Sequence, residues 1–376
     1  MRRGRAVPVI AAVVLVAAGV AVGIVAAAHA TRPGQRFVVP ASINATGATD
    51  VTREMNEFLA SLPPDAVVNF PSGAVYRAEG TLVVSGKHRI TLDGDGATIE
   101  ETTTGVDATP TPGRAFKWPR LRASLLVEYS TSVSIEGLDI DGPNDPGGPG
   151  SYDAALEAQA GVDVEGCKGV VIAGVHIEHV YGDFVYIAGA STDVQVTGNT
   201  FRDNGRQGVS VTNGSDILIS DNEISEIGRS AFDLEPNTAS CLAEDVTISY
   251  NTVTMEHLSF VAAGGQGPYV DHVSILDNTL IDFPMDIYER ASDKARRSNW
   301  IVKGNTDHYV VGSPLAPIRF YYMDNLTISD NVMPMAADRP SVAVYLVDPC
   351  GWTLSGNTFP GAEKTEPQGI AGSCPW

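Results

Sequence analysis

A pattern that ends in asparagine recurs along the second half of the chain at nearly constant intervals. The segments VQVTGNTF (194–201), ILISDNEI (217–224), VTISYNTV (246–253) and VSILDNTL (273–280) follow one template, and three further copies continue it. The shared asparagines are Asn199, Asn222, Asn251, Asn278, Asn305, Asn331 and Asn357. They are 23 to 29 residues apart, and a repeat of this length indicates supersecondary units that stack to share one core.

Each repeat alternates apolar and polar residues, which is typical of strands and excludes helical repeats. Roughly 25 residues at about 3.3 Å each supply one coil of short strands, and such coils stack by parallel pairing at about 4.8 Å. We therefore predict a parallel β-helix in which Val196, Ile219, Ile248 and Ile275 lie in register. The composition agrees, because 43% of the residues are hydrophobic but only 7% are aromatic. We expect the asparagines to form a structural ladder at the turns.

The repeats resemble those of the right-handed parallel β-helix superfamily of pectin-lyase-like proteins. The segment 48–99, which contains FPSGAVY and ends in LDGDGATI, looks like the opening of many such proteins. The resemblance implies an all-β, single-stranded right-handed solenoid of about ten coils over residues 46–360. It does not imply one chemistry, since this superfamily hosts lyases, hydrolases, epimerases and non-catalytic binders.

A short amphipathic helix is expected before the first coil. Asp50 can cap its N-terminus, and Met55, Phe58, Leu59 and Leu62 form its apolar stripe. Such a helix would cover the open end of the solenoid, where strand edges are otherwise unpaired.

Residues 1–30 combine three early arginines with a long apolar run and a small-residue site at Ala28-His29-Ala30. This pattern predicts export to a secreted or extracytoplasmic location. The segment is either a cleaved signal peptide or a single N-terminal membrane anchor, and both alternatives stay open. We expect a linker over 31–45 and a C-terminal tail over 361–376.

Four cysteines in an exported chain favour disulfides over metal or redox chemistry. Cys350 and Cys374 are expected to pair, because the tail can fold back over the last coil. Cys167 and Cys241 follow strands three coils apart, about 14 Å at 4.8 Å per coil, so we expect them to be unpaired.

The charge of the chain restricts its partners. Lys and Arg total 25 against 45 Asp and Glu, a formal net charge of −20. Nucleic acid is therefore excluded as an expected partner, and a polysaccharide or oligosaccharide is expected instead. The oligomeric state does not follow from the sequence.

Two neighbouring copies of the strand before the asparagine turn differ in charge. GRQGVSVTNG (205–214) carries Ser210 and Thr212 where GRSAFDLEPN (228–237) carries Asp233 and Glu235. Alignment of all copies predicts two outward columns on an exposed ribbon. The first is Asp163, Tyr186, Ser210, Asp233, Tyr288, Tyr321 and Tyr345, and the second is Glu165, Ala188, Thr212, Glu235 and Arg290.

Asp233 and Glu235 are the leading catalytic candidates, followed by Asp163 and Asp183. Residues i and i+2 of a strand share a face with stems roughly 6.5 to 7 Å apart, which is in the range of an inverting glycosidase pair. Like charges at this distance raise the pKa of one partner, which suits a general acid. The alternative is that arginines merely neutralise an acidic ladder.

Arg206, Arg229, Tyr186 and Gln207 are the expected substrate-binding residues, because they accompany the acids on adjacent coils. The loops 141–161 and 236–245 are expected to form walls of a groove.

His176 and His179 do not form a metal pair with an evident third ligand, so they are interpreted as turn or surface residues. We expect no metal site and no cofactor, with calcium left open.

Three functions fit these residues. The first is an exported glycoside hydrolase with Asp233 paired to Glu235 or Asp163. The second is a polysaccharide lyase or uronate epimerase, which would use Arg206, Arg229 and Tyr186 against a uronate. The third is a surface glycan binder or structural spike without turnover.

Overall fold

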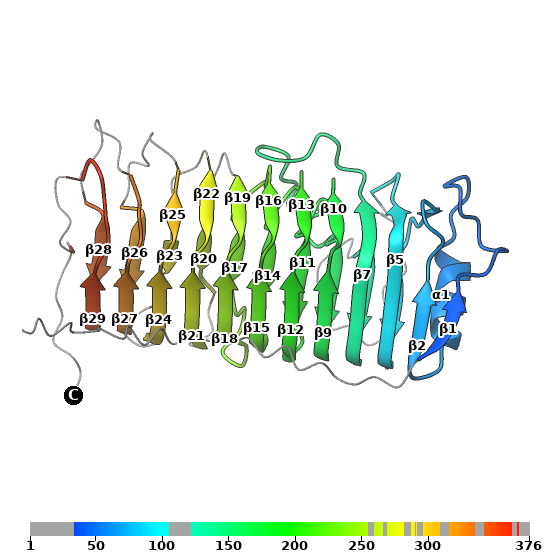
Figure 1. The fold of residues 1–376 in the computed structure, drawn as a ribbon, viewed down its shortest axis with the longest axis horizontal. Helices are drawn as coiled ribbons and strands as arrows, with labels where there is room; N and C mark the ends of the chain where they lie inside the picture. Colours follow the sequence, from blue (N-terminus) through cyan, green and yellow to red (C-terminus); the bar gives the residue numbers. More distant parts are fainter. Residues whose placement is uncertain are drawn as a thin grey trace, which may run out of the picture. The chain divides into compact units, whose positions relative to one another are not determined.

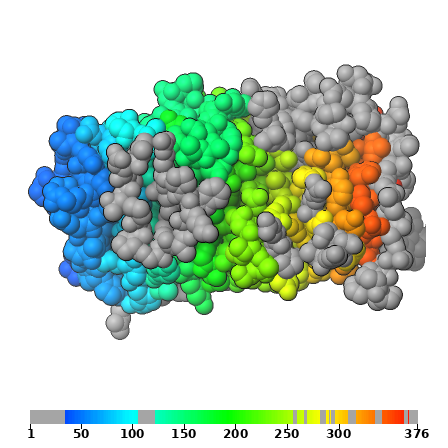
Figure 2. Space-filling model, turned by 180° about the vertical axis from the view of Figure 1, so that it is seen from behind, coloured from blue at the N-terminus to red at the C-terminus, as the bar shows by residue number. Residues whose placement is uncertain are grey.

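The computed structural model describes residues 34–104, 122–254, 259–265, 269–281, 287–289, 291, 296–308, 316–334, 342–362 and 367. These residues form a parallel β-solenoid of about ten turns, almost all strand, with one helix near the N-terminus. Figure 1 shows the strands of successive coils lying side by side, and in Figure 2 the colours follow one another in bands across the surface. The predicted fold class is therefore confirmed.

One face of the solenoid is a ten-stranded parallel sheet, to which each coil contributes one strand. Its strands are β4 (Leu82–Ser85), β6 (Leu125–Glu128), β8 (Val162–Glu165), β11 (Val185–Ala188), β14 (Val209–Val211), β17 (Phe232–Leu234), β20 (Val261–Ala263), β23 (Ile287–Glu289), β26 (Ile318–Tyr321) and β28 (Val344–Val347).

The remaining strands form a second, 19-stranded sheet. Its longer strands are β5 (His88–Glu100), β7 (Thr131–Asp141), β9 (Lys168–Ala173), β12 (Ser191–Thr197), β15 (Gly214–Ser220), β18 (Leu242–Ser249), β21 (Tyr269–Leu276), β24 (Arg297–Lys303), β27 (Met323–Ser329) and β29 (Cys350–Ser355). Its shorter strands are β1 (Gln35–Val38), β2 (Ala66–Asn69), β3 (Val75–Arg77), β10 (His176–Glu178), β13 (Thr200–Arg202), β16 (Glu223–Ser225), β19 (Thr252–Thr254), β22 (Thr279–Ile281) and β25 (Thr306–Asp307).

The predicted register of the core is confirmed. Val196 pairs with Ile219, Ile219 with Ile248, and Ile248 with Ile275. All four side chains are fully buried. Because each coil repeats the same apolar positions, β-branched side chains stack directly on one another along the solenoid.

The asparagine ladder is also confirmed. Asn222 donates through Nδ2 to Oδ1 of Asn251 at 2.8 Å and to the carbonyl of Val196 at 3.0 Å. Its backbone N–H donates to the same Asn251 oxygen at 3.1 Å. The pattern runs from Asn199 to Asn357, so each buried amide of the ladder has hydrogen-bond partners.

The helix α1 (Thr52–Ser61) contacts the N-terminal edge of the ten-stranded sheet. Met55 and Leu59 are buried, and Phe58 is partly buried against the core. Asn56 accepts a hydrogen bond from Val83 N–H at 2.8 Å and donates to the Thr81 carbonyl at 2.9 Å. The helix thus provides partners for backbone groups of edge strand β4, as the capping role requires.

Two expectations near the N-terminus need correction. Asp50 is not the N-cap residue of α1, because Val51 holds that position. The Asp50 carboxylate instead accepts from the Thr52 N–H at 3.0 Å, one residue further out than expected. The range 31–45 is not all linker either, since β1 pairs in parallel with β2.

Cys167 and Cys241 are free thiols, as predicted. Cys350 is disulfide-bonded, and its expected partner Cys374 lies outside the described residues. The expected signal or anchor segment 1–30 also lies outside them. Within the described ranges, no helix has the length and apolar character needed to cross a membrane.

Candidate functional site

The outward face of the ten-stranded sheet carries a row of side chains, here called the outer row. Strand pairing places Asp163, Tyr186, Ser210 and Asp233 next to one another on β8, β11, β14 and β17. Ala262 follows on β20 and Tyr288 on β23. The flanking apolar residues of these strands point into the core, so the two-residue period of the strands selects the outer row.

The outer row departs from the predicted column beyond β23. Arg319 of β26 pairs with Tyr288, and Tyr345 of β28 pairs with Arg319. Tyr321 pairs instead with Val347, two residues further along β26, so its predicted place was wrong. Arg290, expected in the second column, lies outside the described residues.

All eight candidate site residues line one cavity of about 410 Å³. They are Asp163, Asp183, Tyr186, Arg206, Gln207, Arg229, Asp233 and Glu235. The eight residues come from four coils, because parallel stacking brings equivalent positions of successive coils together.

The predicted exposed ribbon is in fact largely buried. Asp163 is 3% exposed and Asp233 is 4% exposed, although both side chains point away from the core. The loop between β7 and β8, residues 142–161, supplies Glu157, Ala158 and Ala160 to the cavity wall. This loop, which we call the β7–β8 loop, was expected at the lip of the groove.

The β7–β8 loop crosses the ends of β10, β13 and β16 before it returns to the site (Figure 1). Gly148 N–H donates to the Asn204 carbonyl at 2.9 Å, and Asn144 N–H donates to the His179 carbonyl at 2.8 Å. Gly147 has no room for a side chain, because a Cβ there would lie 2.3 Å from the Asp203 carbonyl oxygen. The loop is therefore fixed to the coils of β10 and β13 by backbone contacts.

Arg206 is the central cation of the site. Its Nη1 donates to both carboxylate oxygens of Asp183, at 2.9 and 2.7 Å. Its Nε lies 3.6 Å from Glu157, and its Nη2 lies 4.0 Å from Glu235. Burial lowers the pKa of Arg206, but the carboxylates of Asp183, Asp233 and Glu157 raise it above its ordinary value, so the guanidinium keeps its charge.

Gln207 holds Asp233 in one orientation. The Ser230 N–H donates to Gln207 Oε1 at 2.7 Å, which fixes the amide because a backbone N–H can only donate. Gln207 Nε2 must then donate to Asp233 Oδ2, at 3.0 Å. The Gln207 backbone N–H donates to Asp183 at 3.0 Å, so this residue joins both carboxyl groups.

Asp233 has a pKa raised to about 7. Desolvation is the largest cause, and the charge of Glu235 raises the pKa further. Arg206 and Arg229 act in the opposite direction. Near neutral pH this carboxyl group is thus a proton donor on a rigid strand, beside a Glu235 side chain that is 37% exposed.

Tyr186 remains a phenol. Burial is the largest cause that raises its pKa, and the charges of Asp163, Asp183 and Glu165 act in the same direction. Its ring lines the cavity together with that of Tyr288. The two rings offer apolar faces to a ligand.

A family description matches most of this architecture. The model for a right handed beta helix region matches residues 123–371. The chain belongs to the right-handed β-helix family. Curated proteins include no match.

Solved structures share the fold of this β-helix protein at low identity. A family 28 exopolygalacturonase from Yersinia enterocolitica has a TM-score of 0.65 and 12% identity, with 90% of this chain and 77% of that chain covered. An endo-xylogalacturonan hydrolase from Aspergillus tubingensis has a TM-score of 0.64 and 14% identity, with 90% of this chain and 96% of that chain covered. The surface protein and adhesin PfbA of Streptococcus pneumoniae has a TM-score of 0.54 and 15% identity, with 89% of this chain and 100% of that chain covered. At these identities the likeness establishes the fold alone.

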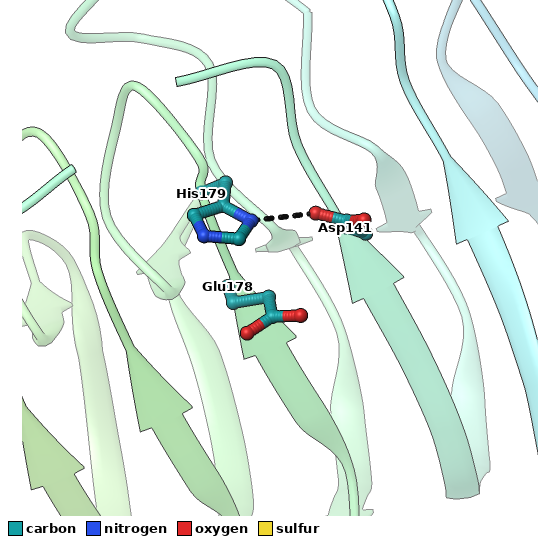
Figure 3. A group of neighbouring side chains, drawn as sticks. All are labelled: Asp141, Glu178 and His179. Atoms are coloured by element: carbon teal, nitrogen blue, oxygen red, sulfur yellow. Dashed lines mark hydrogen bonds and ion pairs between the residues drawn. The ribbon is translucent and has the colours of Figure 1, made fainter. Parts of the chain in front are cut away.

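The β-helix also brings together one histidine and two acidic residues that the sequence did not suggest as a group. Asp141, Glu178 and His179 have donor atoms within 4.8 Å of one another. Figure 3 shows His179 facing Asp141, and the His179 Nδ1 to Asp141 Oδ1 distance is 2.7 Å. Burial lowers the pKa of His179, but the Asp141 hydrogen bond and the charges of Asp141 and Glu178 raise it above its ordinary value. The group is held together by the His179–Asp141 hydrogen bond and by the pairing of β10 with β7.

The sequence did not indicate Glu157 or Gly264 as cavity residues. Glu157 belongs to the β7–β8 loop, for which only the length of the segment indicated a wall. Gly264 comes directly after the last residue of β20, and a Cβ there would meet only Glu235 Oε1, at 3.7 Å. The run of small residues AAGG at 262–265 was the available signal for an open notch.

Proposed function

We propose that this protein is an exported carbohydrate-active enzyme that hydrolyses glycosidic bonds of a polysaccharide or oligosaccharide in the cavity of the ten-stranded sheet. The observation that carries the proposal is Asp233. Its carboxyl group borders the cavity, is oriented by Gln207, and has a pKa of about 7. These are the requirements for a general acid.

Asp233 donates its proton to the glycosidic oxygen. Gln207 donates to Oδ2, so the proton is carried by Oδ1, the oxygen without that contact. Glu235 accepts a proton from a water molecule that attacks the anomeric carbon. The C–O bond to the leaving sugar breaks, Asp233 becomes a carboxylate and Glu235 becomes an acid, and exchange with solvent restores both groups.

The spacing of the two acids supports inversion at the anomeric carbon. Asp233 is on β17 and Glu235 comes directly after its last residue, so two residues of extended chain separate them and their stems are roughly 6.5 to 7 Å apart. The small residues Ala262 and Gly264 lie beside them in the next coil and leave space for sugar and water. Asp163, also at the cavity, is the alternative base.

Arg206, Asp183 and Gln207 act as positioning residues in this proposal. Their polar groups are already bound to one another and to Asp233. Elimination is disfavoured, because the raised pKa of Tyr186 and the charged state of Arg206 leave neither as a base.

The test is product analysis on a panel of neutral and uronic-acid glycans. We expect new reducing ends without ultraviolet absorbance from an unsaturated sugar. Absorbance would identify a lyase, and binding without either signal would identify a glycan binder. The anomeric configuration of the first product, followed by NMR, distinguishes inversion from retention.

A further inference from the structure

A second inference concerns the charge of the ligand, and it rests on the proposed function. We infer that the sugars bound next to Asp233 and Glu235 are uncharged, so that the substrate is a neutral glycan and not a uronate polymer. The cavity's charges, its two committed arginines and its small, aromatic floor all point to this class.

Negative charge dominates the wall. Among the described residues that line the cavity, the ionisable acids are Glu157, Asp163, Asp183, Asp233 and Glu235. The only cations among those residues are Arg206 and Arg229. A uronate carboxylate would therefore enter a site with more negative groups than positive ones. Repulsion between like charges weakens the binding of such a ligand.

Protein carboxylates surround the Arg206 guanidinium, which limits its approach to a substrate carboxylate. Asp183 occupies one edge of its guanidinium through two hydrogen bonds. Glu157 and Glu235 lie at 3.6 and 4.0 Å from its other nitrogens. A bidentate pair with a uronate would have to displace one of these protein carboxylates.

Arg229 is held by the β7–β8 loop. Its guanidinium carbon lies 5.0 Å from the centre of the Tyr152 ring. The Tyr152 hydroxyl donates to Glu157, which in turn faces Arg206. One loop thus uses both arginines as anchors, through a cation–π contact and an ion pair.

The uncharged part of the cavity fits a sugar ring. Ala262 and Gly264 form a notch beside the two acids, and Tyr288 follows on the next strand. Arg319 lies over the Tyr288 ring at 4.6 Å from its centre, which limits rotation of that ring. A fixed tyrosine next to a side-chain-free notch is a platform for the apolar face of a pyranose.

Binding of the intact protein to matched polymers tests the inference. We would measure affinity at 4 °C for neutral glucans, galactans, mannans and xylans. Each would be paired with a C6-oxidised form where C6 is present, and polygalacturonan with its carboxyl-reduced form. We expect the best neutral ligand to bind at least tenfold more tightly than its oxidised form. A uronate polymer that binds as tightly as its reduced form, or no binding to any neutral glycan, would overturn the inference.

The variant Glu157→Gln identifies the source of the exclusion. It removes one wall carboxylate and loosens Arg206 and Arg229, so the ratio of neutral to oxidised affinity should fall severalfold. Circular dichroism and Tm verify folding. An unchanged ratio in a folded variant would contradict the inference.

The two proposals fail separately. A neutral glycan that binds but yields no reducing ends removes the hydrolase and leaves the charge preference standing. Hydrolysis of polygalacturonan in preference to its reduced form supports the hydrolase and removes the charge preference.

Discussion

Two buried carboxyl groups, only two coils apart, share a raised pKa and differ in almost everything else. Asp233 on β17 points outward into the cavity, and Glu289 on β23 points inward into the core. Each has a pKa of about 7, with desolvation as the largest cause. In Asp233 the charge of Glu235 adds to this effect, whereas in Glu289 the charge of Arg297 opposes it.

The contacts explain the difference. Arg297 Nη1 lies 3.2 Å from Glu289, and the Tyr321 N–H donates to the other carboxylate oxygen at 3.2 Å. Arg297 also donates to the carbonyls of Ala263 and Gly264. Glu289 is thus paired with groups of the core and does not line the cavity. A perturbed pKa therefore does not identify a functional acid by itself, and access to a cavity decides between the two roles.

The largest expected effect is on the core pair. Arg297→Met leaves the Glu289 charge without its partner, so we expect a loss of about 3 to 5 kcal/mol in unfolding free energy. Urea denaturation measures it. The control is Lys303→Met on the same strand, since Lys303 is exposed and 3.9 Å from exposed Asp330, which corresponds to about 0 to 1 kcal/mol. Equal effects of the two changes would remove the contrast.

Asp233→Asn should lower activity and leave stability nearly unchanged. We expect the rate of glycan hydrolysis to fall at least about 100-fold, because the general acid is lost. The Tm should change little, since asparagine keeps the Gln207 contact. Asp324→Asn is the matched control, because Asp324 is ion-paired with Arg296 outside the cavity. If Asp233→Asn unfolds the protein and spares activity, Asp233 belongs with Glu289.

The pH dependence of activity sharpens the assignment. Asp233 must be protonated to act, so kcat/KM should decrease about tenfold per pH unit above pH 7. Stability follows the same group: the folded pKa is above the unfolded value of 3.8, so its contribution is lost as the pH rises from about 4 to 7. Rate and Tm profiles against pH measure both effects, and Asp233→Asn should make the fall of Tm between about pH 4 and 7 less steep, while the share of Glu289 remains.

A smaller effect is expected from Arg229→Gln. The charge of Arg229 lowers the pKa of Asp233, so its removal should move the basic limb of the rate profile to higher pH. A purely structural Arg229 would change Tm without moving that limb. Movement to lower pH would contradict the charge assignment.

The sequence by itself determined the solenoid, its register at Val196 through Ile275 and its asparagine ladder, and it placed eight candidate residues that line one cavity. Those features depend on local period: a coil of fixed length places equivalent positions in contact, whatever the loops do. The AAGG notch beside Glu235 was also present in the sequence, although only its contacts gave it meaning.

Tertiary structure decided burial, partners and register beyond β23. The β7–β8 loop supplies Glu157, Ala158 and Ala160 to the cavity that also holds Asp163 and Asp233, and no local pattern specifies where a loop of 20 residues returns. Tyr321 was misplaced because the connection before β26 differs in length from the earlier repeats, so alignment could not fix which residue of β26 pairs with Tyr288. The pKa of Asp233 depends on that same burial, and an alignment of sequence repeats does not show how far a side chain is removed from water.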